Sequence, residues 1–198
     1  MRTAIVSRKR ILEAATTLFS RYGFKRASME DIAAEAGLSR AALYLQFRNK
    51  EDIFRELARE LQEEAMGQAE KAMGAAEPLA ERLRNAVEAR MLRIIEIACS
   101  PHGSELMDEK NRLCGDLWVA NEHRFQAMLT RLFRRANNAA EIDLAAVSLT
   151  AAQAAELFLH ALSGIKGPGV TVEVYRKRLA ALVRVCITGL GASASIAR

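Results

Sequence analysis

Side chains that could bind an anion gather in the first quarter of the chain. Ser28, Ser39 and Tyr44 carry hydroxyls that can bind phosphate oxygens, and Arg40 carries a planar guanidinium that can donate two parallel hydrogen bonds. The first 50 residues hold 10 Lys and Arg against 4 Asp and Glu, whereas the remaining 148 hold 19 against 20. The excess behind the net charge of +5 therefore lies near the N-terminus. Such an asymmetry indicates either a polyanionic partner or a solvated basic surface.

The segment GLSRAALYLQFRNKE, residues 37–51, predicts a short helix with an unusual outer face. Ser39 is a good N-cap, and at helical spacing Leu43 and Phe47 share the side that would face a core. The helix should run to about Phe47. Its opposite face carries Ala41, Tyr44, Leu45 and Arg48. An ordinary solvated face would carry Glu and Lys, so this face suits a partner, although a singly exposed leucine is also common.

A second short helix precedes it in the segment ASMEDIAAEAG. Ser28 is the predicted N-cap, Ile32, Ala33 and Ala36 should face inward, and Gly37 should end the helix. Two short helices joined by a tight turn that contains glycine form a helix-turn-helix, which places its second helix in the major groove of DNA. An earlier helix should end at Gly23.

The run ILEAATTLFSRYGFKRASMEDIAAEAGLSRAALYLQFRNKEDIF resembles the DNA-binding domain of the TetR (tetracycline-repressor) family over about residues 10–57. Its motifs occur in order: a helix ending in Phe-x-x-Tyr-Gly, the Ser-capped MEDIAAEAGLS, Leu-Tyr followed by Phe, and Asn-Lys-Glu. The resemblance implies an all-α homodimer that binds two major grooves of a pseudo-palindromic operator. It also implies a helix-turn-helix domain over residues 1–50 and an effector-binding and dimerisation domain over residues 51–198.

The resemblance also implies roles for single residues. Ser28, Ser39, Tyr44 and Lys50 are expected to hold phosphates, and Arg40 to read a guanine edge. The remaining candidates for DNA contact are Ala41, Ala42, Leu45, Gln46, Arg48, Arg8, Lys9 and Arg10. Alanine and leucine could pack on thymine methyls, Gln46 could read adenine or bind a phosphate, and the three residues at positions 8–10 form a basic arm that is either a DNA contact or a solvated tail. Position 41 is often Gly in the family, and positions 45 and 46 often carry His or an aromatic residue, so the operator sequence does not follow from them.

Apolar periodicity beyond residue 50 predicts further helices over about residues 50–73, 78–99, 105–137 with an interruption near Cys114, 142–165 and 171–190. An effector pocket is expected between Pro78 and Leu162, with walls formed by Met91, Cys114, Trp118, Asn121, Phe125, Met128 and Phe158. A dimer interface is expected from Ala151, Ala155, Phe158, Leu162, Tyr175, Leu179, Leu182 and Cys186. Both stripes could instead be ordinary core, since an apolar stripe at helical spacing usually is.

The sequence lacks the residue patterns that are typical of several other classes of protein. The sequence shows no nucleophile–base pairing, Gly-rich phosphate loop or carboxylate cluster of recognisable spacing, so no enzyme activity and no cofactor are predicted. The three cysteines match neither a zinc site nor a disulfide framework, so they are expected to be buried thiols, with a redox role for Cys114 as the alternative. His102 and Glu105 together provide too few ligands for a metal ion. Without a signal peptide or a run of about 18 apolar residues, we expect a cytoplasmic protein. A ligand-responsive repressor is the predicted function, and the alternatives are a nonspecific or architectural DNA-binding protein and a helical enzyme.

Overall fold

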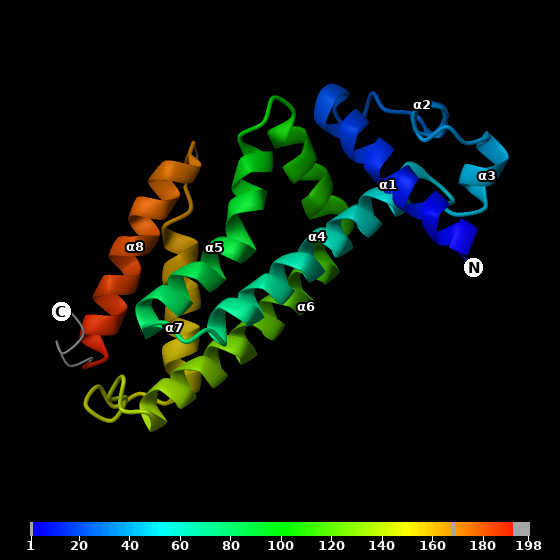
Figure 1. The fold of residues 1–198 in the computed structure, drawn as a ribbon. Helices are drawn as coiled ribbons and strands as arrows, with labels where there is room; N and C mark the ends of the chain where they lie inside the picture. The colour runs from blue at the N-terminus through cyan, green and yellow to red at the C-terminus, as the bar shows by residue number, and fades with distance from the viewer. Residues whose placement is uncertain (1, 168, 192–198) are drawn as a thin grey trace. The chain divides into compact units, whose positions relative to one another are not determined.

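The structure is a computed structural model that describes residues 2–167 and 169–191. The described residues form eight helices and no strand, which confirms the predicted all-α fold (Figure 1). The helices are α1 Arg2–Tyr22, α2 Met29–Glu35, α3 Arg40–Tyr44, α4 Lys50–Met73, α5 Leu79–Ala98, α6 Gly103–Asn138, α7 Ala151–Gly164 and α8 Val172–Gly189. None of the helices in this described part is both long and apolar enough to cross a membrane.

The chain divides into two compact units. The first comprises residues 1–63 and 97–118, and the second comprises residues 64–96 and 119–198. Helices α4, α5 and α6 each have residues in both units, so the division does not follow the expected boundary at residue 50. The functional domains expected over residues 1–50 and 51–198 stay a prediction.

The core of the first unit forms where α1, α2 and α3 turn their apolar sides toward the start of α4. Ile11, Ile32, Leu43 and Ile53 are fully buried in it. Three aromatic rings close one end of this core, with centroids of Phe19 and Phe24 separated by 5.3 Å, Phe24 and Phe54 by 5.3 Å, and Phe19 and Phe54 by 6.0 Å. Such tilted ring pairs add to the burial of apolar surface, so the short helices α2 and α3 are held by packing rather than by their own propensity.

The predicted interruption of α6 lies at Cys114. Its backbone has φ −126° and ψ 17°, which is outside the helical region and kinks the helix. Arg55 of α4 donates to the Leu113 carbonyl oxygen beside the kink, and its guanidinium also donates to both carboxylate oxygens of Asp116, at 2.9 and 2.8 Å. One guanidinium therefore supplies partners on both sides of the break, where the regular ladder of helix hydrogen bonds is interrupted.

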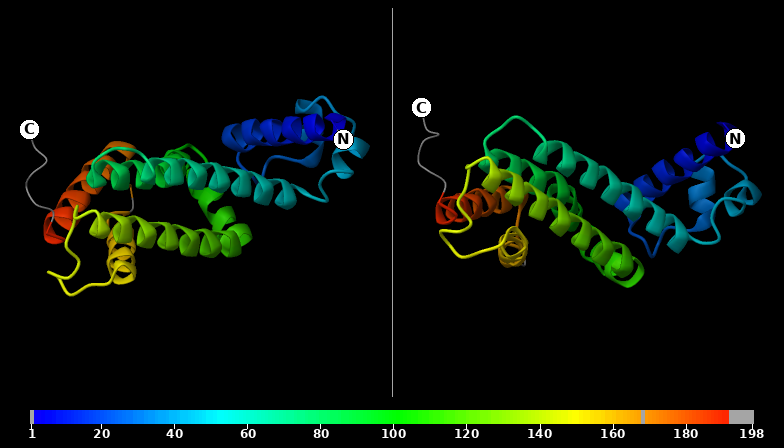
Figure 2. Two further views of the ribbon diagram at one scale, coloured as in Figure 1. Left: turned by 60° about the horizontal axis from the view of Figure 1, so that its bottom comes forward. Right: turned by 90° about the horizontal axis from the view of Figure 1, so that it is seen from below.

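The second unit has its own core. Helix α7 and helix α8 run antiparallel beside each other (Figure 1), and both pack with α5 and with the later parts of α4 and α6. Phe133 of α6 and Phe158 of α7 meet edge to face at a centroid distance of 6.2 Å. Two further views show the same long α4 and α6 and the connection from α6 to α7 (Figure 2). Arg82 near the start of α5 and Glu141 in that connection form a largely buried ion pair at 2.5 Å.

Three predicted helix boundaries were wrong. The helix expected from about residue 142 begins at Ala151, because Thr150 and Gln153 form a capping box there and the preceding residues fold into turns. The helix expected from Ser39 to about Phe47 ends at Tyr44, and the turn that follows keeps Phe47 buried through its N–H bond to the Leu43 carbonyl. The basic residues expected as an arm before the first helix belong to α1 itself.

The Arg55–Asp116 pair should give the protein a pH-dependent stability. Hydrogen bonding to Arg55 lowers the pKa of Asp116 to about 2, from 3.8. A lowered pKa means that the pair stabilises the folded chain above about pH 4 and that this contribution is lost as the pH falls toward about 2. We expect Asp116→Asn to reduce the free energy of unfolding at pH 6, and the difference from the unsubstituted chain to shrink on acidification.

Urea denaturation of both proteins between about pH 6 and pH 2.5 measures this difference. Asp108→Asn, which removes an exposed carboxylate of the same helix without touching Arg55, is the control. A difference for Asp116→Asn that stays constant over this range would contradict the assignment.

Candidate functional site

Both predicted capping serines begin their helices as expected. The Ser28 hydroxyl oxygen accepts from the Asp31 N–H at 3.1 Å, and the Ser28 backbone N–H donates to the Asp31 carboxylate at 3.0 Å, which completes a capping box. The Ser28 hydroxyl also donates to the Asp31 carboxylate at 2.6 Å. Ser39 accepts from the Ala42 N–H at 3.2 Å, so its own hydroxyl hydrogen remains available to donate. The two serines therefore differ: Ser28 is fully engaged with α2, whereas Ser39 can also donate to an anion at the start of α3.

The outer face of α3 is exposed, as the sequence predicted. The Leu45 side chain is 85% exposed and Tyr44 is 47% exposed, while Leu43 is fully buried. Ala41 and Arg48 are also exposed, and Ala42 and Gln46 are half-buried. This face combines an aliphatic side chain, a phenol and methyl groups with basic residues at its ends, which are the groups that contact base edges and phosphates in a major groove.

Two of the predicted basic contacts are engaged within the protein. Arg40 forms an ion pair with Glu30 of α2, so the guanidinium expected to read a base has an acidic partner in the free chain. Arg8 pairs with Glu56 of α4 at 2.7 Å, and its guanidinium lies 4.5 Å from the centre of the Phe47 ring. Arg8 thus holds α1 to α4 and to the end of the helix-turn-helix, a cation–π contact that residue spacing could not reveal.

Lys9 and Arg10, the other two residues of the predicted basic arm, remain on the surface. Lys9 pairs loosely with Glu13 one turn along the helix at 3.6 Å. The Arg10 guanidinium reaches the end of α2, where a Cβ added to Gly37 would lie 2.7 Å from it. Gly37 also has φ +62°, a conformation that favours glycine, so the turn before α3 accepts this approach without strain.

Lys50 has an internal role that the sequence reasoning missed. Its ammonium donates to three carbonyl oxygens, those of Phe24 at 3.0 Å, Lys25 at 3.1 Å and Ala27 at 3.0 Å. It also lies 4.7 Å from the centre of the Phe24 ring. Because an ammonium has three hydrogens, all of its donors are used by the connection between α1 and α2. In the free chain, the ammonium that was expected to bind a phosphate has this structural role.

The residues expected to line an effector pocket are divided between the two units. Met91, Phe125, Met128 and Phe158 share the core of the second unit, and each has at most 3% of its surface exposed. Asn121 also belongs to the second unit and is half-buried. Cys114 and Trp118 belong to the first unit.

Cys114 and Trp118 lie in different local environments. Burial raises the pKa of the Cys114 thiol, which disfavours the reactive thiolate and the redox role considered for this residue. The Lys110 ammonium lies 4.2 Å from the centre of the Trp118 ring. This distance is that of a cation–π contact.

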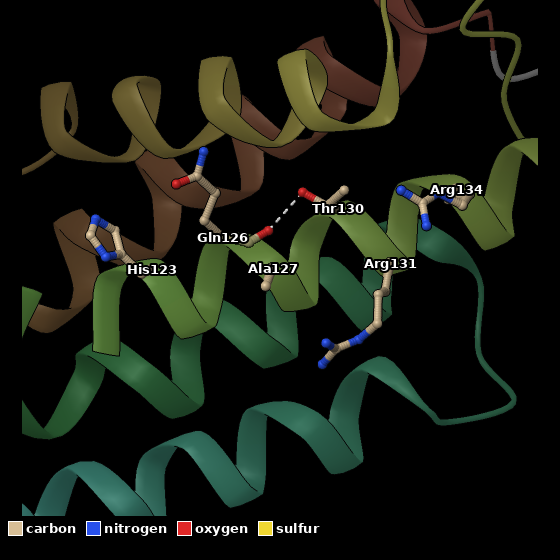
Figure 3. A pocket seen from close by; sticks show the side chains of 6 residues that line it. All are labelled: His123, Gln126, Ala127, Thr130, Arg131 and Arg134. Atoms are coloured by element: carbon tan, nitrogen blue, oxygen red, sulfur yellow. Dashed lines mark hydrogen bonds between the residues drawn. The ribbon is translucent and has the colours of Figure 1, made fainter. Parts of the chain in front are cut away.

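A shallow hollow lies on the surface of α6. Its volume is about 430 Å³, within the range of small-molecule sites, and its six lining residues are His123, Gln126, Ala127, Thr130, Arg131 and Arg134 (Figure 3). The Thr130 hydroxyl donates to the Gln126 carbonyl oxygen at 2.9 Å. None of the residues expected in the effector pocket lines this hollow.

Five of the eight residues expected at a dimer interface are buried in the core of the single chain. They are Ala155, Phe158, Leu162, Tyr175 and Leu179. The remaining three, Ala151, Leu182 and Cys186, are half-buried. The apolar stripe read from the sequence is the side of α7 and α8 that faces the core of their own unit. Apolar residues out of register with that stripe, Leu157, Val174 and Val185, are exposed instead, and helical spacing alone could have singled them out.

Comparison with known proteins agrees with this fold. Residues 11–57 match the family described as bacterial regulatory proteins, tetR family. The chain is 35% identical over 84 residues to the uncharacterized HTH-type transcriptional regulator YhgD of Bacillus subtilis, a match that covers 42% of this chain and 44% of that protein. It spans less than half the length of the first curated relatives that it matches.

Two solved structures extend the likeness to the whole fold. The TetR family transcriptional regulator PfmR from Thermus thermophilus is 28% identical, with a TM-score of 0.60 over 88% of this chain and 97% of that chain. A putative transcriptional regulator from Saccharomonospora viridis in complex with choline is 21% identical, with a TM-score of 0.63 over 89% and 95% of the two chains.

The fold and the site together define an all-helical protein with an N-terminal helix-turn-helix. Its capped α2 and α3, the exposed face of α3 and the matched residues 11–57 place this helix-turn-helix among the DNA-binding domains of one family. That family is the one described as bacterial regulatory proteins, tetR family, and the match to it covers residues 11–57 of this chain.

The structural role of Lys50 leads to a prediction about stability. Lys50→Met keeps the aliphatic stem but leaves three carbonyls without their shared donor, so we expect the free energy of unfolding to fall by about 2 kcal/mol or more. Lys25→Met removes the same charge from an exposed side chain and should change stability little. Urea denaturation of the two variants makes the comparison. If Lys50→Met were as stable as Lys25→Met, the carbonyl contacts would not hold this connection.

Proposed function

We propose that this chain is a cytoplasmic transcriptional regulator that binds a pseudo-palindromic DNA operator as a homodimer and is released by a small apolar or amphipathic effector. The exposed face of α3 carries this proposal. A leucine that is 85% exposed beside a half-exposed tyrosine gains nothing in water, but both fit the floor and the phosphate edge of a major groove. The family match and the excess positive charge of the first 50 residues support the same partner.

Contacts to DNA divide between phosphates and base edges. The free hydroxyl hydrogen of Ser39 and the backbone N–H groups at the start of α3 suit a phosphate, as does the Tyr44 hydroxyl. Arg48 is exposed at the far end of the same surface and suits a second phosphate. Leu45 and Ala41 suit thymine methyls.

Arg40 is the proposed reader of a guanine, and its pairing with Glu30 has a consequence for that role. Binding to a base must either break the ion pair or use the guanidinium N–H groups that Glu30 leaves free. Both side chains of the pair are substantially exposed, at 65% and 46%, so the exchange of a carboxylate for a base edge has a low desolvation cost.

Base reading and phosphate binding predict different effects of two substitutions. We expect Arg40→Ala to weaken binding to the preferred operator by about 1–3 kcal/mol and to relax the preference at one base pair. Arg48→Ala should weaken binding to all sequences alike and reduce the salt dependence by about one phosphate contact. An operator obtained by binding-site selection, a set of its single-base variants and random DNA, measured at several salt concentrations, distinguish the two. Equal losses by Arg40→Ala on operator and random DNA would contradict its role.

A dimer is proposed because one α3 covers too few base pairs for a specific site, and two must lie about 34–36 Å apart to reach successive grooves. The exposed apolar residues of α7 and α8 offer the surface. Val174 and Val185 lie on one side of α8 with the exposed Ala181 between them, and Leu157 projects from α7. Exposed apolar groups on two neighbouring antiparallel helices suit a four-helix contact between two copies.

A charge on this surface should separate the copies. We expect Leu157→Glu combined with Val185→Glu to convert the protein to a species of 21.8 kDa and to weaken operator binding by at least about 100-fold. Val119→Glu places the same charge at a valine of α6 that is 55% exposed, and it should leave the assembly intact. Sedimentation equilibrium measures the mass. A dimer that persists in the double variant would rule out this surface.

The proposed coupling to an effector uses contacts between the start of α6 and the helix-turn-helix region. The Glu105 carboxylate accepts from the Lys25 N–H at 2.6 Å, and the His102 ring lies 3.1 Å from the Arg21 carbonyl oxygen. Leu106 is buried in the same core as α1–α3. A shift of α6 on effector binding would therefore move the turn after α1 and change the separation of the two α3 helices. The choline complex of the Saccharomonospora viridis neighbour supports a small-molecule site in this fold.

The second candidate is a nonspecific DNA-binding protein without an effector. The paired Arg40 and the engaged Lys50 argue against it, because a protein that relied on charge alone would leave its basic groups free for phosphates. Competition binding separates the two functions: a specific regulator should prefer its operator by at least about 10³ over random DNA.

A further inference from the structure

The second unit buries the phenol of Tyr175 without a hydrogen-bond partner among the described residues. Tyr175 lies near the start of α8, its side chain is fully buried, and its hydroxyl oxygen has no hydrogen-bond partner among the described residues. Buried hydroxyls are almost always hydrogen-bonded, because leaving one without a partner costs free energy. Burial raises the pKa of this phenol, so the group keeps its proton at neutral pH and is a donor without an acceptor.

A buried arginine lies in the same region of the core. Arg90 of α5 is 7% exposed, forms an ion pair with Glu122 of α6, and stacks 4.6 Å from the centre of the Phe125 ring. The register of α8 on α5 is fixed by Arg176, the residue after Tyr175, which pairs with Glu88 at 3.4 Å. Tyr175 therefore faces the stretch of α5 that contains Arg90, and the two residues share this core with Val87 and Met91 of α5.

The carboxylate partner of Arg90 is the accessible member of the pair. The Glu122 side chain is 37% exposed, whereas that of Arg90 is 7% exposed. A buried guanidinium requires an anion, since its charge would otherwise be uncompensated. The exposed carboxylate can turn into water and be replaced by another, whereas the guanidinium cannot leave.

The hollow lies on α6, the helix that also carries Glu122. Gln126, one helical turn after Glu122, lines it, and the arginines Arg131 and Arg134 stand farther along it (Figure 3). Its volume of about 430 Å³ suits a small organic molecule, and its cationic side chains attract an anion.

From these contacts we infer a binding site for an apolar carboxylic acid, in which the ligand carboxylate takes the place of Glu122 on Arg90 and accepts a hydrogen bond from Tyr175. The site gives the orphan phenol an acceptor and keeps the buried guanidinium neutralised. Apolar residues around it, among them Met91 and Phe125, would bury the rest of the ligand. This inference deepens the proposed function, since it names the class of effector, but binding of the acid is measured without DNA.

The probes are decanoate and 2-naphthoate, each compared with the alcohol of the same carbon skeleton, decanol and 2-naphthalenemethanol. Isothermal titration calorimetry on the full chain at pH 7 measures the affinities. We expect saturable binding of at least one acid, with its alcohol at least about tenfold weaker, because only the acid satisfies Arg90. No saturable binding of either acid, or equal affinity of acid and alcohol, would overturn the inference.

Two substitutions test the residues, with opposite signs. Tyr175→Phe removes a hydroxyl that has no partner, so the free protein should melt at an equal or higher temperature, while affinity for the acid should fall about tenfold or more. Glu122→Gln removes the competing carboxylate, so the free protein should melt at a lower temperature and bind the acid more tightly. Glu173→Gln, which removes an exposed carboxylate on α8, is the control and should change neither.

Unchanged affinity in Tyr175→Phe, or weaker binding in Glu122→Gln, would contradict the assigned roles, and the second variant keeps the test valid if the first fails to fold. The outcome is independent of the DNA proposal. Acid binding without operator binding would refute the proposed regulator and keep the site, and operator binding without acid binding would do the reverse.

Discussion

Three backbone carbonyls converge on one ammonium, that of Lys50, and the surface proposed to face DNA depends on this contact. The connection between α1 and α2 has few side chains that could hold it, so its carbonyls need a donor from elsewhere. Lys50 supplies it from the first turn of α4, and Glu105 of α6 binds an N–H of the same connection. The angle at which α2 and α3 leave α1 is thus set by two longer helices, because five-residue and seven-residue helices are too short to be stable alone.

Contacts within the protein determine which basic residues remain free to bind a partner. Arg8 and Lys50 are used within the first unit, and Arg40 is shared with Glu30. Lys9, Arg10 and Arg48 remain exposed, and Ser39 and Tyr44 at the two ends of α3 add hydroxyl groups. Such an arrangement favours recognition by shape and a few directed hydrogen bonds over binding through net charge, which is the physical difference between a specific site and a nonspecific one.

In the second unit, α7 and α8 each have one apolar side that faces the core and another side that carries exposed apolar residues. Along α7 and α8 the apolar stripe that faces the core is continuous, with Phe158 and Tyr175 as its largest members, and the exposed valines and leucine lie on the other side. Within the core a buried arginine and a phenol interrupt the apolar packing. Polar groups in a core lower stability unless they are satisfied; Arg90 is paired with Glu122, whereas the Tyr175 hydroxyl has no partner among the described residues.

The sequence alone determined the all-α class, the helix-turn-helix with its serine caps, the exposed face of α3 and the break near Cys114, because each of these follows from local spacing, capping chemistry or glycine placement. Only the tertiary structure decided what the long-range partners are. That Lys50 binds carbonyls, that Arg40 meets Glu30 and that Tyr175 is buried within the single chain all depend on which helices meet. A periodic stripe of apolar residues predicts that one face of a helix is buried. Which other helix covers that face depends on how the whole chain packs.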